Sequence, residues 1–87
     1  MTEEITLAGI EPFAHRDLDI TAETCPMTFV RTRLMLDRMA VGEVLLVLCR
    51  GEEPRRNIPR TAAEQGHAVL RQDDGPGGLT RLWIRKA

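Results

Sequence analysis

The residue with the clearest chemical potential in this sequence is Cys25, which Pro26 follows directly at the start of a helix-like segment. Proline has its φ angle fixed near the helical value and lacks a backbone N–H, so it suits the first helical position and makes Cys25 the N-cap. A thiol at that point faces unpaired N–H groups and the positive end of the helix dipole, and both favour the thiolate. Because the thiolate is the reactive form, we expect Cys25 to be a nucleophile.

The second cysteine, Cys49, closes an apolar run later in the chain. Two cysteines do not make a disulfide framework, a Cys-x-x-Cys motif or a four-ligand zinc site, so we expect no metal and no cofactor. One hypothesis is that Cys49 resolves a sulfur adduct on Cys25 or forms a regulatory disulfide with it. The other is that Cys49 is a small buried hydrophobic residue at a strand end, a common role of free cysteine.

The helix-like segment after Cys25 carries more apolar surface than one contact face needs. Five side chains at helical spacing are expected to face or border the sheet: Phe29, Thr32, Met35, Leu36 and Met39. Three others lie on a different side of the helix: Met27, Val30 and Leu34. These three are either exposed or partly covered by N-terminal residues, or they form a docking stripe for a partner protein beside the cysteine.

Two arginines, Arg31 and Arg33, lie within one to two helical turns of Cys25. Their charges could raise the thiolate fraction of the cysteine or guide an acidic partner to it. The alternative is that they belong to a solvated helix face.

Strand-like and helix-like segments alternate along the chain and would position these residues. Aspartates alternate with apolar residues over 17–21 and predict a short strand, and the apolar run 43–49 predicts a central strand. A helix is predicted between them, over residues 26–39. In a right-handed β-α-β unit, parallel strands end at the same edge of the sheet, so Cys25 and Cys49 should both lie at that edge.

The second half of the chain predicts another helix and a hairpin. After a turn at 51–54, a helix is expected within residues 54–65, with Pro59 beginning its regular part and Gly66 as its C-terminal cap. The remaining strands, separated by a turn rich in aspartate and glycine, are expected over 68–72 and 79–85.

The resulting element order, β-α-β-α-β-β, predicts an α+β fold. A two-layer α/β sandwich, with a four-stranded mixed sheet and both helices on one face, buries the helices with the fewest elements. The length of 87 residues suits one small domain, which we place at residues 17–87. Residues 1–16 lack clear periodicity and are interpreted as an N-terminal extension.

Composition argues against several classes of function. The formal net charge of −1 gives no drive toward direct binding of nucleic acid. No apolar stretch is long enough to cross a membrane. The start of the chain, Met1-Thr2-Glu3-Glu4, lacks the layout of a signal peptide, so we expect a cytoplasmic protein.

Several motifs occur in an order that resembles the TusA/SirA family of sulfur carriers over roughly residues 17–86. They are Leu18-Asp19-Ile20, then Cys25-Pro26-Met27-Thr28-Phe29-Val30-Arg31-Thr32-Arg33, then Val41-Gly42-Glu43-Val44-Leu45-Leu46-Val47, and finally Asn57-Ile58-Pro59. The sequence departs from the family pattern at two motif positions, because Thr28 replaces the second proline of Cys-Pro-x-Pro and Asn57 replaces an aspartate. Thr28 restores a backbone N–H that could point at the Cys25 sulfur, and it loosens the turn.

The resemblance implies that Cys25 accepts sulfane sulfur as a persulfide and passes it on. The chain would then be a sulfurtransferase-type carrier between a donor, either a cysteine desulfurase or a rhodanese-like protein, and an acceptor protein. Thiolation of transfer RNA or sulfur oxidation would be the outlet. Pro26 and Thr28 would support the helix start, and Met27, Val30, Arg31, Arg33 and Leu34 would form the docking surface.

Two further hypotheses remain open from the sequence. In the first, the chain is a non-catalytic interaction or regulatory module, and Cys25-Pro26 serves only to start a helix. In the second, it is a thiol redox switch that uses Cys25 and Cys49.

Overall fold

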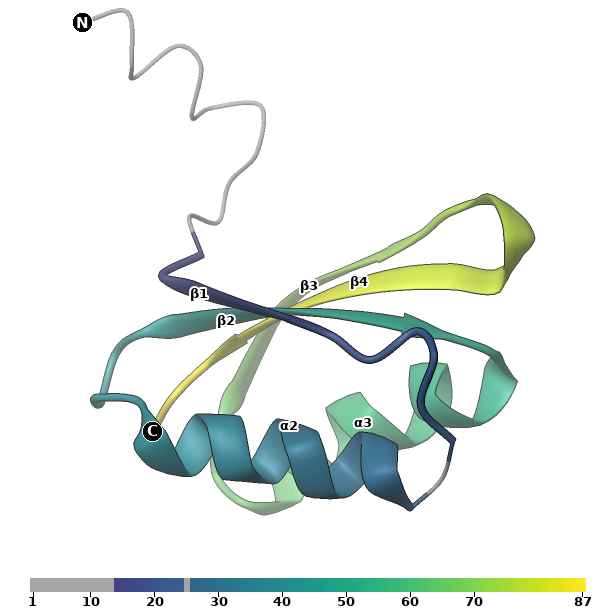
Figure 1. The fold of residues 1–87 in the computed structure, drawn as a ribbon. Helices are drawn as coiled ribbons and strands as arrows, with labels where there is room; N and C mark the ends of the chain where they lie inside the picture. Colours follow the sequence, from purple (N-terminus) through teal and green to yellow (C-terminus); the bar gives the residue numbers. More distant parts are fainter. Residues whose placement is uncertain (1–13, 25) are drawn as a thin grey trace, which may run out of the picture.

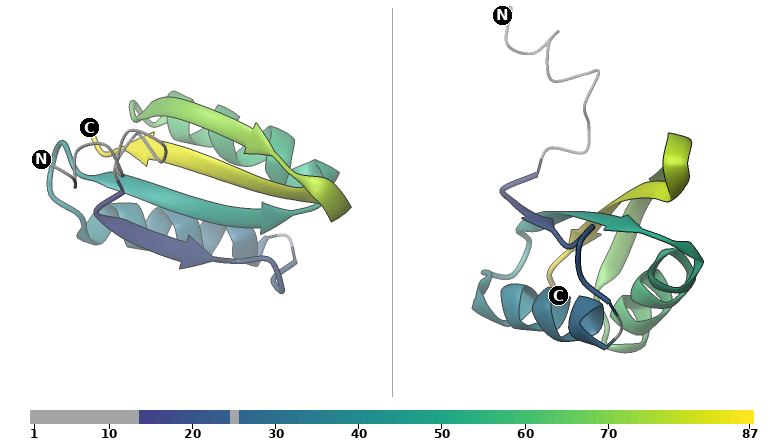
Figure 2. Two further views of the ribbon diagram at one scale, coloured as in Figure 1. Left: turned by 90° about the horizontal axis from the view of Figure 1, so that it is seen from above. Right: turned by 45° about the vertical axis from the view of Figure 1, so that its right-hand side comes forward.

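The computed structural model describes residues 14–24 and 26–87, which build a four-stranded sheet with two helices on one face (Figure 1). The elements, in chain order, are β1 (Arg16–Asp19), α2 (Met27–Arg38), β2 (Val44–Arg50), α3 (Glu52–Glu64), β3 (Ala68–Asp74), the 3₁₀ turn η1 (Pro76–Gly78) and β4 (Leu79–Arg85). The strands lie in the order β1-β2-β4-β3 (Figure 2). β1 is parallel to β2, and the other neighbouring pairs are antiparallel. The predicted α+β sandwich is confirmed.

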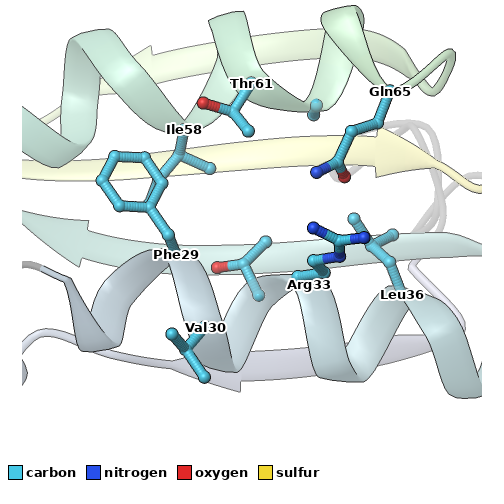
Figure 3. A pocket seen from close by; sticks show the side chains of 9 residues that line it. Phe29, Val30, Arg33, Leu36, Ile58, Thr61 and Gln65 are labelled. Atoms are coloured by element: carbon cyan, nitrogen blue, oxygen red, sulfur yellow. The ribbon is translucent and has the colours of Figure 1, made fainter.

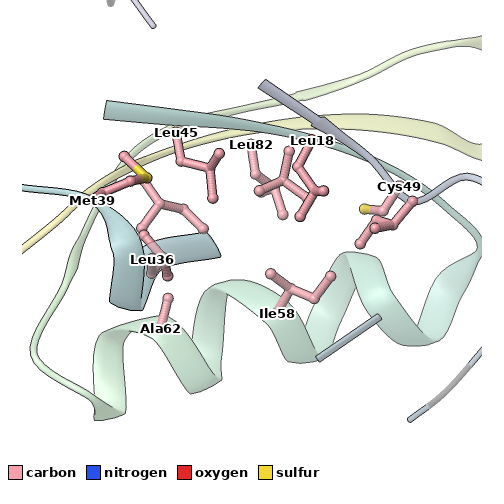
Figure 4. Close-up of a cluster of buried hydrophobic side chains, with 11 residues drawn as sticks. Leu18, Leu36, Met39, Leu45, Cys49, Ile58, Ala62 and Leu82 are labelled. Atoms are coloured by element: carbon pink, nitrogen blue, oxygen red, sulfur yellow. The ribbon is translucent and has the colours of Figure 1, made fainter. Parts of the chain in front are cut away.

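β2 is a central strand, because it pairs with β1 on one side and with β4 on the other. Leu45, Val47 and Cys49 alternate along it and have no exposed surface. They meet side chains of both helices and of β1 and β4 in one cluster (Figure 4). The continuous apolar run that predicts this strand reflects burial of its core face and partial burial of its outer face.

β1 begins at Arg16, inside the predicted extension, and ends two residues before the predicted strand end. Just before it, His15 N–H donates to Val44 O at 2.8 Å, and Val44 N–H donates to His15 Nδ1 at 3.0 Å. These bonds lengthen the pairing with β2. The rest of the predicted extension, residues 1–13, lies outside the described residues.

α2 begins one residue later than predicted, and Pro26 holds the N-cap position that the sequence assigns to Cys25. The backbone of Pro26 has φ −93° and ψ 5°, which is a turn conformation, and its carbonyl accepts the N–H groups of Phe29 and Val30 at 3.1 Å each. The helix ends before Met39, and the Lys86 ammonium donates to a carbonyl of its last turn.

The face that α2 turns to the sheet is largely the predicted one. Thr32, Leu36 and Met39 are buried, and Phe29 and Met35 pack at the border of the core. In addition, Thr28 is only 2% exposed, which the prediction did not include.

α3 begins at Glu52, so the predicted turn at 51–54 is wrong beyond Gly51. Gly51 adopts φ +106° immediately before the helix, and Pro54 falls in the first turn, where its missing N–H costs nothing. Pro59 lies inside one continuous helix rather than at a new start. The helix continues through it because Ile58 and Ala62 are buried against the sheet, and that packing offsets one lost backbone hydrogen bond.

β3 extends two residues beyond its predicted end because both added aspartates find partners. Asp73 lies 3.7 Å from the Arg81 guanidinium, and the Thr80 hydroxyl donates to Asp74 at 3.1 Å. Arg55 of α3 also contacts Asp74 at 3.1 Å, which ties the hairpin end to the start of α3.

Candidate functional site

The candidate site lies at the edge of the sheet where β1 and β2 end and both helices begin (Figure 1). Because β1 and β2 are parallel, their carboxyl ends meet at this edge, as the sequence predicts. Cys25 lies outside the described residues. The site is therefore built from the residues that flank Cys25 in the chain and from those across the edge.

A cleft of about 240 Å³ lies between the N-terminal ends of α2 and α3. Its lining comprises Glu23, Thr24, Thr28, Arg50, Gly51, Glu52, Glu53 and Pro54. Thr24 precedes Cys25 in the chain, and Thr28 follows it by three positions. The positive ends of two helix dipoles therefore converge on one cleft, and they favour negative charge there.

Hydrogen bonds fix residues 19–23, the first part of the connection from β1 to α2. The Asp19 carboxylate accepts the Thr21 hydroxyl at 2.7 Å and the Thr21 N–H at 3.0 Å, and these bonds lower the pKa of Asp19. Ile20 N–H donates to Leu48 O at 2.9 Å, and Glu23 N–H donates to Ile20 O at 3.1 Å. Residues 19–23 therefore have a defined path across the sheet edge.

Thr28 lines the α2 side of the cleft and has a buried hydroxyl. Its Oγ1 has no hydrogen-bond partner in the described part of the chain, although its carbonyl accepts the Thr32 hydroxyl at 2.8 Å. The sequence suggests a role for the backbone N–H of Thr28, whereas the structure shows that its side-chain hydroxyl is buried without a partner among the described residues. The spacing of four residues between Thr28 and Thr32, which is predicted to face the sheet, could have indicated that Thr28 is buried too.

Cys49 lies in the core near the carboxyl end of β2, on the helix side of the sheet (Figure 4). It has no exposed surface, and burial, with a smaller effect of the Asp74 charge, raises its pKa from 9.0 to about 11. At neutral pH this residue is a thiol that solvent does not reach. That environment favours the hypothesis of a small hydrophobic residue over that of a resolving cysteine.

Three apolar side chains of α2 form the feature that we call the docking stripe: Met27, Val30 and Leu34. They are 43%, 42% and 53% exposed, respectively. No described residue covers them fully, so the described structure leaves an apolar surface on the helix that starts at the candidate site.

The two arginines near the stripe differ in their contacts. The Arg31 guanidinium lies 3.1 Å from the Glu23 carboxylate, so its charge is balanced beside the cleft. Arg33 borders a mostly apolar groove between α2 and α3, where its guanidinium and the Gln65 amide point toward one another from the two helices (Figure 3). Phe29 and Ile58 lie at the other end of this groove. Val30 of the docking stripe and Arg33 therefore both line the groove between α2 and α3.

Within residues 14–24 and 26–87, no group of three or more His, Cys, Asp and Glu residues is arranged to hold a metal ion. The same ranges contain no helix that is long and apolar enough to span a bilayer.

The family model described as "Sulfurtransferase TusA" matches residues 16–86. A protein of Archaeoglobus fulgidus named as a candidate sulfur carrier is 44% identical over 57 residues, which are 66% of this chain and 65% of that protein. The sulfur carrier protein TusA of Pseudomonas entomophila is 33% identical over 69 residues, which are 79% of this chain and 85% of that protein.

The fold also matches a solved structure. The crystal structure of a SirA-like protein from Desulfitobacterium hafniense superposes with a TM-score of 0.70 at 21% identity, and it covers 80% of this chain and 95% of that one. At this level of identity the match supports the fold.

Proposed function

This chain belongs to the TusA family, and we propose that it carries sulfane sulfur as a persulfide on Cys25 in a cytoplasmic sulfur relay. The donor would be a cysteine desulfurase or a rhodanese-like protein, and the acceptor a protein of tRNA thiolation or sulfur oxidation. The observation that carries the proposal is the Cys25-Pro26 pair, which stands directly before α2 in a chain whose residues 16–86 match the family.

The chemistry asked of Cys25 is a pair of sulfur transfers. Its thiolate attacks the outer sulfur of a donor persulfide, a new S–S bond forms at Cys25, and the donor's S–S bond breaks so that the donor leaves as a thiolate. The outer sulfur keeps its proton, and no external oxidant is consumed. In the second step an acceptor thiolate attacks that outer sulfur, and the Cys25 thiolate leaves.

The surroundings of position 25 suit a group that alternates between thiolate and persulfide. The N-termini of α2 and α3 meet at the adjoining cleft, and both favour negative charge. The nearest carboxylate in the chain, Glu23, is paired with Arg31 at 3.1 Å, which reduces its repulsion of a thiolate. Neither step needs a general acid or base from this chain, because thiolates both attack and leave.

We further propose that donor and acceptor dock on the surface formed by the docking stripe with Arg31 and Arg33. Met27, Val30 and Leu34 supply apolar area, and the rim of the groove between α2 and α3 adds a cation at Arg33. A partner that presents apolar side chains and a carboxylate would match both features.

The test is sulfur loading followed by intact mass. After incubation with a cysteine desulfurase and cysteine, the wild-type chain should gain the mass of one sulfur atom, which a reductant removes. Cys25→Ser should gain nothing, and Cys49→Ala should load like the wild type. A parallel reaction with inorganic polysulfide, which requires no protein docking, separates the chemistry of Cys25 from recognition of the donor. Sulfur on the Cys25→Ser variant, or an unloaded wild type in both reactions, would refute the proposal.

A non-catalytic interaction module is the second candidate, and the exposed docking stripe favours it. Under that hypothesis Cys25→Ser leaves partner binding and the cellular phenotype intact, whereas Leu34→Asp abolishes both. Under the sulfur-carrier proposal, Cys25→Ser preserves binding but eliminates transfer. The thiol redox switch has less support, since Cys49 has no exposed surface.

A further inference from the structure

The buried face of α2 contains two threonines, and only one of them has its hydroxyl satisfied. The Thr32 hydroxyl donates to the Thr28 carbonyl at 2.8 Å. Thr28 is 2% exposed, and its own Oγ1 has no hydrogen-bond partner in the described part of the chain. Thr28 is also the only residue of that part with a buried side-chain oxygen or nitrogen in this condition.

An unpaired buried hydroxyl is costly and calls for an explanation. A helical threonine normally donates to the carbonyl four residues earlier, which here belongs to Thr24. That carbonyl accepts the Met27 N–H at 2.8 Å, and the Thr28 hydroxyl does not donate to it. Valine has nearly the shape of threonine without the hydroxyl, so packing alone does not account for threonine at this position.

The unpaired hydroxyl belongs to a residue that lines the cleft between the starts of α2 and α3. Thr24, which directly precedes Cys25 in the chain, and Glu23 line the same cleft. The other side-chain donors of this lining are the Thr24 hydroxyl and the Arg50 guanidinium, one nitrogen of which donates to Gly77 O at 2.8 Å, and the remaining charged groups are carboxylates. Within this lining Thr28 is the residue whose hydroxyl is both buried and without a partner among the described residues, so its donor is available to an anion at the start of α2.

We propose that the Thr28 hydroxyl is the hydrogen-bond donor for the sulfur anion at Cys25, an inference that rests on the proposed function. The donor stabilises the Cys25 thiolate when it attacks the donor persulfide and again when it leaves after transfer. A better-stabilised thiolate is a better leaving group, so the larger effect falls on delivery of sulfur rather than on loading. Thr28 replaces the second proline of the family pattern, and a proline has no side-chain donor, so this device distinguishes the chain from members with Cys-Pro-x-Pro.

The experiment compares three variants of the full chain. Thr28→Val removes the hydroxyl at nearly constant shape, Thr28→Ser keeps it, and Thr32→Val is the matched control, because it removes a buried hydroxyl from the same face one turn later. The pKa of the Cys25 thiol is read from the rate of iodoacetamide alkylation between pH 5 and 10, with the modified residue assigned by peptide mass. Release of sulfur from the loaded chain to a small thiol is measured separately.

Thr28→Val is expected to raise the pKa of the Cys25 thiol by about one unit, since hydrogen bonds to charged groups are worth about that much. Its sulfur release should slow by about threefold, given the partial dependence of exchange rates on leaving-group acidity. Thr28→Ser and Thr32→Val should keep the wild-type thiol pKa.

An unchanged thiol pKa in Thr28→Val, or an equal increase in Thr32→Val, would overturn the role of the Thr28 hydroxyl. The two proposals fail separately. A wild-type chain that never loads sulfur refutes the carrier function, whereas a chain that loads normally but whose Thr28→Val variant matches the wild type in thiol pKa and release refutes only the present inference.

Discussion

The burial of Cys49 predicts a specific loss of stability at alkaline pH. Folding raises the pKa of this thiol from 9.0 to about 11, so the folded chain keeps the proton over a range in which the unfolded chain releases it. The stability that comes from this difference is complete below pH 9 and is lost as the pH rises through 11. At about 1.4 kcal/mol per pKa unit, the loss amounts to about 3 kcal/mol.

Cys49→Ala is the informative perturbation, because it removes the titrating group and leaves the rest of the sheet. The variant is expected to start about 1 kcal/mol less stable, since it loses a buried sulfur. Its free energy of unfolding should then depend less on pH, so the two proteins converge between pH 9 and 11 and can cross. Few other groups titrate in that window, because the chain has one lysine and no tyrosine, and both proteins share the remaining ones.

The assay is urea unfolding followed by the fluorescence of Trp83, the single tryptophan. Trp83 is 6% exposed, and the guanidinium carbons of Arg71 and Arg81 lie 5.6 and 5.8 Å from its ring centre, so unfolding changes its environment completely. Free energies of unfolding are compared at half-unit steps from pH 8 to 11. Parallel curves for the wild type and Cys49→Ala would show that the burial of Cys49 does not set its pKa, and the reasoning would fail.

Two further changes test the docking stripe and the end of α2. Leu34→Asp should slow sulfur loading from the desulfurase by about tenfold, as is usual when a well-packed interface residue is lost, while loading from polysulfide stays unchanged. The control is Val41→Asp, at a site outside the stripe that is 78% exposed. Equal effects of the two substitutions would argue against docking at the stripe. Lys86 Nζ donates to Leu36 O at 2.6 Å, and a charged donor at a helix C-terminus contributes about 1 kcal/mol to stability. Lys86→Met should therefore lower the melting temperature by about 4–8 °C. An unchanged melting temperature would contradict that contribution.

The fold could be predicted from the sequence because it depends on the periodicity of apolar residues. The buried alternation of Leu45, Val47 and Cys49 and the helical spacing of Leu36 follow from burying one face of each element. The continuity of α3 could not be predicted, because Pro59 is a local signal against a helix. The packing of Ile58 on the sheet overrides that signal.

The sheet edge at which the candidate site lies could be predicted from the sequence, because β1 and β2 are parallel, but the surroundings of that edge could not. The Cys25-Pro26 pair and the stripe residue Leu34 follow from residue type and spacing. The burial of the Thr28 hydroxyl depends on where α2 begins and on what packs across from it. Local signals place helix boundaries poorly, so burial is hardest to predict for a residue of the first turn such as Thr28.

The arrangement of charge around the sheet edge supports a sulfur site more than it supports stability. Carboxylates at this edge would raise the pKa of a nearby thiol if they stood alone. Three of them are paired with arginines: Glu23 with Arg31, Glu52 with Arg55 and Arg56, and Asp74 with Arg55. Exposed ion pairs of this kind add little to folding free energy, because water screens them. Their consequence is local, since they limit the repulsion of an anion at the edge where the N-termini of two helices converge.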